Sequence, residues 1–296
     1  MKAIITGATG FVGSHLAKKL PDAILAGRDT NKIERIFGKR EARPWSGAGN
    51  SDPAFLEGVE TIFHLAGESI FHGRWNAAKK KRIRDSRVEG TRHLVDHIAK
   101  CEHKPATLIC SSAVGYYGSR GDETLTEHAS FGNDFLARVC MDWEKEALRA
   151  EEYGVRVVLI RTGVVLGSDG GALSQMLLPF KLGVGGRLGN GNQFMSWIHI
   201  DDLVNSMIQA SENIAIKGAI NAVAPNSVTN RVFTETLANA LHRPAILPAP
   251  RFVLKLALGE FADVLLGSQR AVPEELEQAG FKFAFPLLKD AFSDLL

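Results

Sequence analysis

The sequence predicts an α/β fold: a doubly wound, mostly parallel sheet with a smaller C-terminal lobe on the substrate side. Short apolar runs alternate with segments of helical spacing through the first two thirds of the chain, a pattern typical of a parallel sheet covered by helices. A glycine-rich turn follows the first apolar run directly. The length of 296 residues allows one large domain or two closely joined ones.

The apolar runs and helical segments can be placed in order along the chain. Apolar positions with period two or in short unbroken runs predict strands, and apolar stripes with charges opposite predict helices. The glycine-dense stretch 183–191 interrupts this order and is typical of a lid or a substrate wall. The expected strands are 2–6, 22–26, 61–65, 107–111, 155–162, 193–200 and 219–223, and the expected helices are 79–100, 134–150, 201–212, 230–241 and 252–266, with a short amphipathic segment at 285–296.

The predicted domain organisation follows from these elements. Residues 1–170 form the nucleotide-binding domain, although later segments also supply strands to its sheet. Residues 171–247 form a substrate-side lobe interleaved with that sheet, and residues 248–296 form a C-terminal segment that packs over the cleft or serves a dimer interface.

Composition excludes several classes of protein. The 35 Lys and Arg against 33 Asp and Glu leave a formal charge of +2, which argues against a polybasic nucleic-acid binder. No apolar stretch reaches 18 residues, so we expect no signal peptide, no membrane partner and a cytoplasmic location. Cys101, Cys110 and Cys140 are too widely spaced for a disulfide framework or a zinc site. We therefore expect buried thiols and no metal.

The motif Gly7-Ala8-Thr9-Gly10-Phe11-Val12-Gly13 lies between the first strand and an amphipathic helix. Small residues there let the backbone approach a pyrophosphate, whose charge then lies at the helix N-terminus. A glycine pattern alone is weak evidence, but the strand before it and the helix after it strengthen the interpretation. Dinucleotide binding is predicted, through Gly7, Thr9, Gly10, Phe11 and Val12.

The second expected strand ends in Gly27-Arg28-Asp29. An acidic residue at this point would bind the ribose 2′-hydroxyl of NAD, whereas an arginine accommodates the 2′-phosphate of NADP. Gly27 and Arg28 therefore predict NADP. The alternative is an exposed ion pair between Arg28 and Asp29 with no role in binding.

Several motifs together resemble the extended short-chain dehydrogenase/reductases. More narrowly, the chain resembles the YfcH-like NAD(P)-dependent epimerase family, whose members carry a C-terminal domain of unknown function. The resemblance covers essentially the whole chain. Its motifs are GATGFVG (7–13), HLAG (64–67), SSAVGYYG (111–118), the run 170–203 that ends in WIHIDDL, and SQRAVPEELEQAGF (268–281).

The resemblance implies a Rossmann-type sheet, a bound NADP and a cleft formed with the C-terminal lobe, for an unidentified small-molecule substrate and with a homodimer possible. It also places further residues at the cofactor. These are Leu65, Ala66 and Gly67 after the third expected strand, Arg82 and Arg87 on the following helix, and Val164.

The usual catalytic machinery of the wider family is missing from this chain. That machinery pairs a proton-exchanging Tyr with a Lys four residues later, and none of the three tyrosines has a Lys at that spacing. The resemblance aligns Leu136 and Cys140 with the Tyr and Lys positions, and Ala113 with the usual Ser or Thr. Leucine cannot supply a phenolate-type base. The family mechanism cannot therefore be transferred unchanged.

Two hypotheses remain. In the first, the chain is an NADP-dependent oxidoreductase or epimerase-like enzyme that acts on a hydroxyl or carbonyl compound. Proton transfer has then moved to Glu68, to Tyr116 or Tyr117, or to His199, and Arg82 or Arg87 replaces the missing cation. Alternatively, Glu68 caps a helix and His199 is a half-buried structural residue. In the second hypothesis, the chain senses NADP(H) without turnover and acts through a protein partner; some plastid and cyanobacterial relatives are labelled as division-related.

Overall fold

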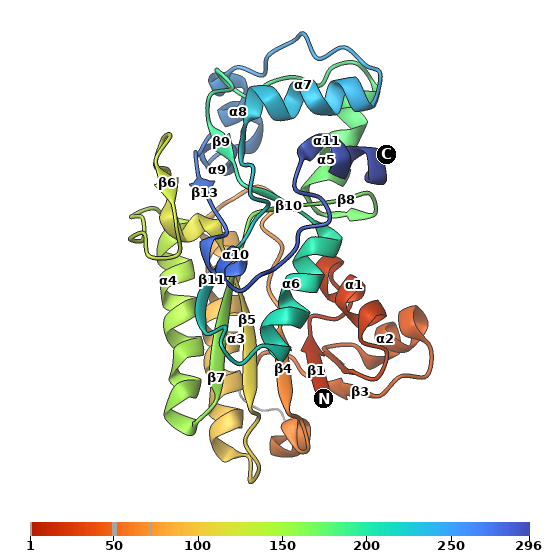
Figure 1. Cartoon of the computed structure of the whole chain (residues 1–296), viewed down its shortest axis with the longest axis vertical. Coiled ribbons are helices and arrows are strands. Elements are labelled where there is room, and N and C mark those ends of the chain that lie inside the picture. The colour runs from red at the N-terminus through yellow and green to blue at the C-terminus, as the bar shows by residue number, and fades with distance from the viewer. Residues whose placement is uncertain (1, 49–51, 72) are drawn as a thin grey trace.

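The computed structural model describes residues 2–48, 52–71 and 73–296. Its centre is a seven-stranded sheet in which every neighbouring pair is parallel (Figure 1). The strand order reverses between β1 and β4, as in a doubly wound sheet. The predicted fold class is thus confirmed. The strands in spatial order are β11 (Gly218–Ala222), β7 (Arg156–Thr162), β5 (Thr107–Ala113), β4 (Thr61–His64), β1 (Ala3–Thr6), β2 (Ile24–Gly27) and β3 (Ala42–Pro44).

Helices cover both faces of the sheet because successive strand residues point to opposite sides. On β1, Ile5 joins one apolar cluster and Ile4 joins the other. The Ile5 face packs against α1 (Phe11–Lys19), α2 (Thr30–Phe37), α6 (Ile200–Glu212) and α10 (Glu274–Gln278). The Ile4 face packs against η1 (Pro53–Leu56), α3 (Ala77–Lys100), α4 (Phe135–Leu148) and η3 (Arg149–Tyr153).

A smaller lobe lies beyond the carboxyl ends of the strands, above the sheet in Figure 1. Trp197, Phe233 and Phe292 are fully buried in its core. Its elements are β8 (Val164–Gly167) paired with β10 (Trp197–His199), β9 (Phe194–Met195) paired with β12 (Val228–Thr229), β13 (Arg270–Ala271) paired with β6 (Thr124–Leu125), and the helices α5 (Gly171–Lys181), α7 (Asn230–Ala240), α8 (Arg251–Leu258), α9 (Phe261–Leu265) and α11 (Leu288–Leu295).

The structure corrects some predicted boundaries. The single strand expected at 193–200 is divided into β9 and β10 at Ser196, whose hydroxyl accepts the Ala271 N–H and donates to the Gln269 carbonyl. The helix expected at 252–266 is divided at Gly259, which has a φ of 63°, a conformation that glycine tolerates without strain. Several elements were not predicted: strand β3, helices α2, α5 and α10, and the short strands β6, β8, β12 and β13.

The described part of the chain contains neither a membrane-spanning helix nor a metal cluster. None of its helices is long and apolar enough to span a membrane. No three or more of its His, Cys, Asp or Glu side chains are placed together to hold a metal ion. The three cysteines are free and buried.

Candidate functional site

The glycine loop lies at the carboxyl end of β1, where the strand order reverses. Gly7 has a φ of +73°, and a Cβ there would lie 2.9 Å from the Ala66 backbone. A Cβ on Gly13 would lie 2.3 Å from the Gly7 carbonyl oxygen. Helix α1 begins at Phe11, and no side chain caps its N-terminus at Gly10. Only glycine fits this close approach, which leaves a side-chain-free helix N-terminus of the kind that binds anions.

Phe11 fixes this loop to the smaller lobe. Its ring contacts the turn between β8 and α5, where a Cβ on Gly167, Gly170 or Gly171 would come within 2.7 Å of it. The ring therefore points into the protein. The predicted residues Thr9 and Val12 are half-buried beside it.

Arg28 and Asp29 do not pair with each other. Asp29 is the N-cap of α2 and accepts the Lys32 N–H at 2.9 Å, and its second oxygen lies 3.9 Å from the Arg35 guanidinium. Arg28, which directly follows Gly27 at the end of β2, is exposed and makes no side-chain hydrogen bond or ion pair within the described residues. The guanidinium is therefore available to a ligand.

Glu68 follows β4 and forms a cluster of charges with the start of α3. Its carboxylate lies 2.8 Å from the Lys79 ammonium and 3.6 Å from Nε of Arg82. The hydrogen bond from Lys79 lowers the pKa of Glu68 against the opposing effect of burial. Glu68 is thus held ionised. It does not cap α3, whose N-cap is Asn76.

Arg87 and Cys140 lie next to each other between α3 and α4. The Arg87 guanidinium donates to the Glu68 carbonyl at 3.0 Å, and its atoms lie 3.4–3.5 Å from where a Cβ on Gly67 would stand. Burial raises the pKa of the Cys140 thiol to about 12, and the Arg87 charge partly opposes that shift. Cys140 is therefore a neutral thiol, with a cation beside it.

Leu136 lies in an apolar cluster that the C-terminal segment completes. Leu136 and Phe135 pack against the buried Trp75 and Phe261, and the Trp75 ring lies 5.6 Å from the Phe261 ring and 5.8 Å from the Phe135 ring. Phe261 comes from α9, which is distant from α4 in sequence. The position expected for a catalytic Tyr is thus part of a hydrophobic contact between lobes.

Tyr116 and Tyr117, in η2 (Val114–Tyr117), have different environments. Tyr117 is fully buried; its hydroxyl donates to Asn221 Oδ1 at 2.7 Å and accepts from Arg161 at 3.1 Å. Burial raises the pKa of Tyr117 to about 12. Tyr116 is half-buried, and its ring centre lies 3.6 Å from the Arg161 guanidinium carbon. Tyr116 is therefore the more accessible of the two phenols.

Arg161 belongs to a buried polar network that joins the ends of β5 and β7. Its guanidinium makes two hydrogen bonds to Glu144, at 2.8 and 2.9 Å, and Ser112 donates to the same carboxylate at 2.6 Å. A bidentate pair with its remaining sites satisfied is stable inside a protein. The network supports the sheet end on which Tyr116 lies.

His199 is turned away from the other predicted catalytic residues. Its neighbours Ile198 and Ile200 join the apolar cluster that includes Phe11, so the alternation of the strand directs His199 toward the C-terminal segment. There the ring stacks on Phe285 with centroids 3.9 Å apart. Nδ1 of His199 accepts the Asp201 N–H, Nε2 lies 3.3 Å from Asp294, and burial lowers the pKa of the imidazole. No contact in the described structure joins it to Glu68 or Tyr116.

Comparison with known proteins identifies the family. Residues 3–222 match the NAD dependent epimerase/dehydratase family, and residues 249–295 match a domain of unknown function, DUF1731. The chain belongs to the epimerase/dehydratase family. The predicted resemblance is confirmed.

Relatives in this family match over nearly full length. The chloroplastic epimerase family protein SDR39U1 homolog of Arabidopsis thaliana is 41% identical over 303 residues, covering 100% of this chain and 87% of its own. Epimerase family protein YfhF of Bacillus subtilis is 39% identical, and the match covers 100% of this chain and 98% of YfhF. The crystal structure of human epimerase family protein SDR39U1 with NADPH matches with a TM-score of 0.91 at 33% identity. The match covers 100% of this chain and 99% of the human chain.

Lys79 is a site residue of this family member that the sequence pattern did not indicate. Its side chain is buried on Glu68, whereas the run Lys79-Lys80-Lys81-Arg82 is typical of a solvated helix face. The available signal was helical spacing, because Lys79 lies four residues before the buried Ile83 and so shares its inward face.

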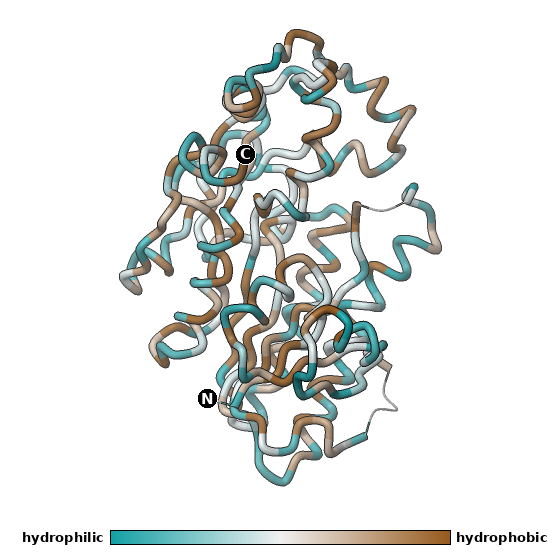
Figure 2. The backbone as a smooth tube through the Cα atoms, turned by 90° about the vertical axis from the view of Figure 1, so that its right-hand side faces the viewer, coloured by the Kyte–Doolittle hydropathy of each residue, from teal (hydrophilic) through white to brown (hydrophobic). Residues whose placement is uncertain are grey.

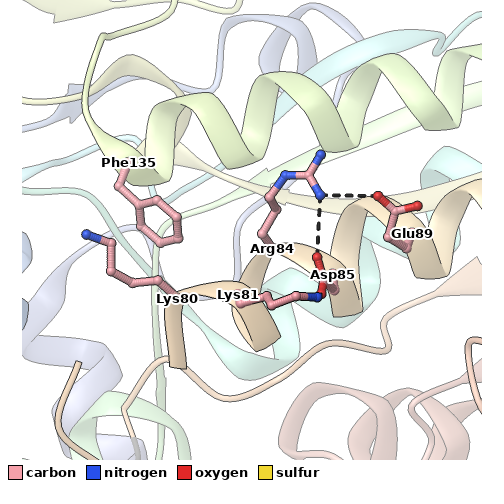
Figure 3. Close-up of a pocket in the computed structure, with 6 residues that line it drawn as sticks. All are labelled: Lys80, Lys81, Arg84, Asp85, Glu89 and Phe135. Atoms are coloured by element: carbon pink, nitrogen blue, oxygen red, sulfur yellow. Dashed lines mark hydrogen bonds and ion pairs between the residues drawn. The ribbon is translucent and has the colours of Figure 1, made fainter. Parts of the chain in front are cut away.

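A hollow of about 490 Å³ lies between α3 and the start of α4 (Figure 3). Its charges are paired with one another or with neighbours: Arg84 with Asp85 and Glu89, Lys81 with Asp85, and Lys80 with Glu260. Because the acids offset the cations, these residues do not form an anion site.

Proposed function

We propose that this epimerase-family protein binds NADP(H) and uses it as an oxidoreductase or epimerase-like enzyme on a small hydroxyl or carbonyl compound. The observation that carries the proposal is the exposed Arg28 guanidinium beside the glycine loop, which has no partner among the described residues because Asp29 caps α2. The crystal structure of human SDR39U1 with NADPH supports the same cofactor. The free buried cysteines fit a reducing, cytoplasmic location.

The residues at the sheet edge fit such a cofactor. The loop from Gly7 to Val12 would hold the pyrophosphate with backbone groups and the N-terminus of α1. Arg28 would bind the 2′-phosphate. Leu65, Ala66, Gly67 and Val164, at the ends of β4 and β7, would flank the bound molecule. When bound, the nicotinamide supplies the hydride donor or acceptor.

Arg87 is the candidate for the cation that the family pattern places at Cys140. Its charge partly opposes the rise that burial causes in the pKa of the Cys140 thiol, and it lies against Gly67 at the end of β4. Arg82, the other sequence candidate, is largely exposed and turned toward Glu68. A guanidinium remains charged at all physiological pH values, so Arg87 would hold a ribose hydroxyl without exchanging protons.

Two groups remain for proton transfer. Glu68 is ionised and partly accessible, so it is in the form that accepts a proton, although the Lys79 contact that lowers its pKa also makes it a weaker base. The Tyr116 phenol, supported by Arg161, is suited to donate one to a carbonyl oxygen. His199 is not included because the C-terminal segment covers it.

The test is NADPH oxidation against a panel of small aldehydes and ketones, with Glu68→Gln and Tyr116→Phe as variants. We expect each variant to lose at least about tenfold in turnover while its NADPH affinity stays unchanged. Tyr153→Phe, beyond the far end of α4, is the matched control and should behave as wild type. Full activity in both variants would place the proton relay elsewhere.

One observation favours the second candidate, an NADP(H)-sensing regulator without turnover. The positions of the family Tyr and Lys hold Leu136 in an apolar cluster and Cys140 as a buried neutral thiol, and neither can exchange a proton with a substrate near neutral pH. A sensor would retain a protein partner with one redox form of the nucleotide. Equal recovery of partners with NADP⁺, with NADPH and without nucleotide would exclude this candidate.

A further inference from the structure

Half of the large hydrophobic side chains that are exposed in the described structure gather at one end of the molecule, far from the N-terminus. The end is formed by α5, the two loops that cross above α7 in Figure 1, and the outer face of α8. Figure 2 shows hydrophobic stretches along the same end. These side chains, which we call the apolar crest, are Leu178, Leu182, Val184, Ile246, Leu247, Phe252, Val253 and Leu256, between 42% and 82% exposed.

Hydrogen bonds join two of the segments that carry the crest. The 185–189 loop runs beside residues 247–249: the Gly189 N–H donates to the Ala249 carbonyl at 2.9 Å, and the Ala249 N–H donates to the Arg187 carbonyl at 2.8 Å. The Arg243 side chain donates to the Lys181 carbonyl at 3.3 Å. Two segments that are far apart in sequence are thus held side by side.

The crest is basic as well as apolar. The segments 170–200 and 236–259 contain five Lys or Arg residues and no Asp or Glu. Arg251 and Lys255 each lie 3.2 Å from Asp263. The other three, Lys181, Arg187 and Arg243, form no ion pair within the described residues.

Packing of helix α8 on the protein does not explain the apolar side chains on its exposed side. Its inner side carries the buried Leu254, and Leu258 packs against the Phe261 cluster. Its outer side carries Phe252, Val253 and Leu256, where a surface helix ordinarily carries polar residues. Contiguous exposed apolar surface of this kind indicates a contact with something else.

We propose that the apolar crest docks on the surface of an anionic phospholipid bilayer. Aliphatic and aromatic side chains that project beside an excess of cations, three of which have no acidic partner among the described residues, suit insertion at the level of lipid headgroups. The expectation of no membrane partner rests on the absence of an 18-residue apolar stretch, a pattern that detects membrane-spanning segments only. The crest is a different surface, which appears only when the two segments fold together.

A second copy of this chain fits the crest less well. A two-fold dimer through this surface would place the same patch on both sides. The three unpaired cations of one copy would then share the interface with the same three cations of the other copy, at a cost from like-charge repulsion. An anionic bilayer instead attracts them.

The test is co-sedimentation of the full chain with vesicles of equal parts phosphatidylcholine and phosphatidylglycerol, with pure phosphatidylcholine vesicles in parallel. Binding is expected only to the anionic vesicles and should weaken as salt is added. Ile246→Glu should reduce binding by about tenfold or more, because an exposed aliphatic side chain that the bilayer would bury is replaced by a charge. Ile214→Glu is the matched control: both isoleucines are 82% exposed, but Ile214 follows α6 at the opposite end of the molecule.

Absence of binding by the wild-type chain, or equal binding by the Ile246→Glu and Ile214→Glu variants, would overturn the proposal. So would a dimer in light scattering that Ile246→Glu dissociates, since the crest would then be a subunit interface. Titration with NADPH tests the proposed cofactor binding independently of the membrane proposal, because no crest residue belongs to the glycine loop or its neighbours.

Discussion

At the scale of single residues, the availability of Arg28 depends on the side chain that follows it. Asp29 could neutralise the guanidinium, but its carboxylate caps α2 through the Lys32 N–H. N-cap hydrogen bonds of this type stabilise a helix by about 1 kcal/mol. The sequence allowed both interpretations of Arg28, because the direction of the Asp29 side chain depends on where the helix begins.

We predict that Arg28→Glu lowers NADPH affinity by at least about tenfold, since a phosphate contact is replaced by like-charge repulsion. NADH affinity should change little, because NADH has no 2′-phosphate. Fluorescence titration with each nucleotide measures both values, and Arg138→Glu, on the surface of α4, controls for the change in net charge. Equal losses for the two nucleotides would remove Arg28 from the binding site.

At the scale of elements, local pattern predicted the strands well and the helices of the smaller lobe less well. The short, largely apolar runs at 61–65 and 107–111 correspond to β4 and β5, because a strand buried on both faces is apolar at most positions. By contrast, the apolar run at 252–266 gave no sign that Gly259 divides it into α8 and α9. The division lets α9 turn inward, so that Phe261 reaches Trp75.

The Phe261 contact leads to a stability prediction. The Phe261 side chain is 8% exposed and packs against the Trp75 and Phe71 rings. Phe261→Ala should lower the free energy of unfolding by about 3 kcal/mol or more, from lost burial and a cavity. Urea denaturation measures the loss, and Phe131→Ala is a control that should cost far less, because Phe131 is half exposed. A loss below about 1 kcal/mol would mean that α9 is not anchored by this ring.

At the scale of the whole molecule, the candidate site depends on contacts that sequence periodicity cannot show. The glycine loop and Arg28 could be located because each lies beside a recognisable strand end. The burial of His199 under Phe285, the pairing of Lys79 with Glu68, and the Leu136 cluster all join segments that only the tertiary fold brings together. Residue type and spacing therefore identified the cofactor side of the site better than its catalytic side.

The buried His64 makes the stability of the whole chain depend on pH. Its Nδ1 lies 2.8 Å from the Thr6 hydroxyl and its Nε2 lies 3.0 Å from the Thr91 hydroxyl. Burial lowers the pKa of His64 from 6.5 to about 4, so the folded state binds fewer protons than the unfolded state between these values. The stabilising contribution is complete above pH 6.5, decreases as the pH falls below 6.5, and is fully lost once the pH has fallen through about 4.

We expect wild type to lose about 2 kcal/mol more than His64→Gln between about pH 7.5 and about pH 5, since glutamine has no such titration. Urea denaturation of both proteins at the two pH values gives the difference, which cancels the effect of the carboxylates common to both. The same loss in both proteins would show that His64 is protonated without cost in the folded state.

A parallel fluorescence titration of the wild-type chain with NADPH and NADH is the decisive measurement for the cofactor assignment. The free Arg28 and the glycine loop predict clear preference for NADPH, since only NADPH carries the 2′-phosphate that Arg28 can bind. Equal affinity for both nucleotides would contradict the role of Arg28. Binding of neither would mean that the glycine loop serves only the packing of β1 and α1.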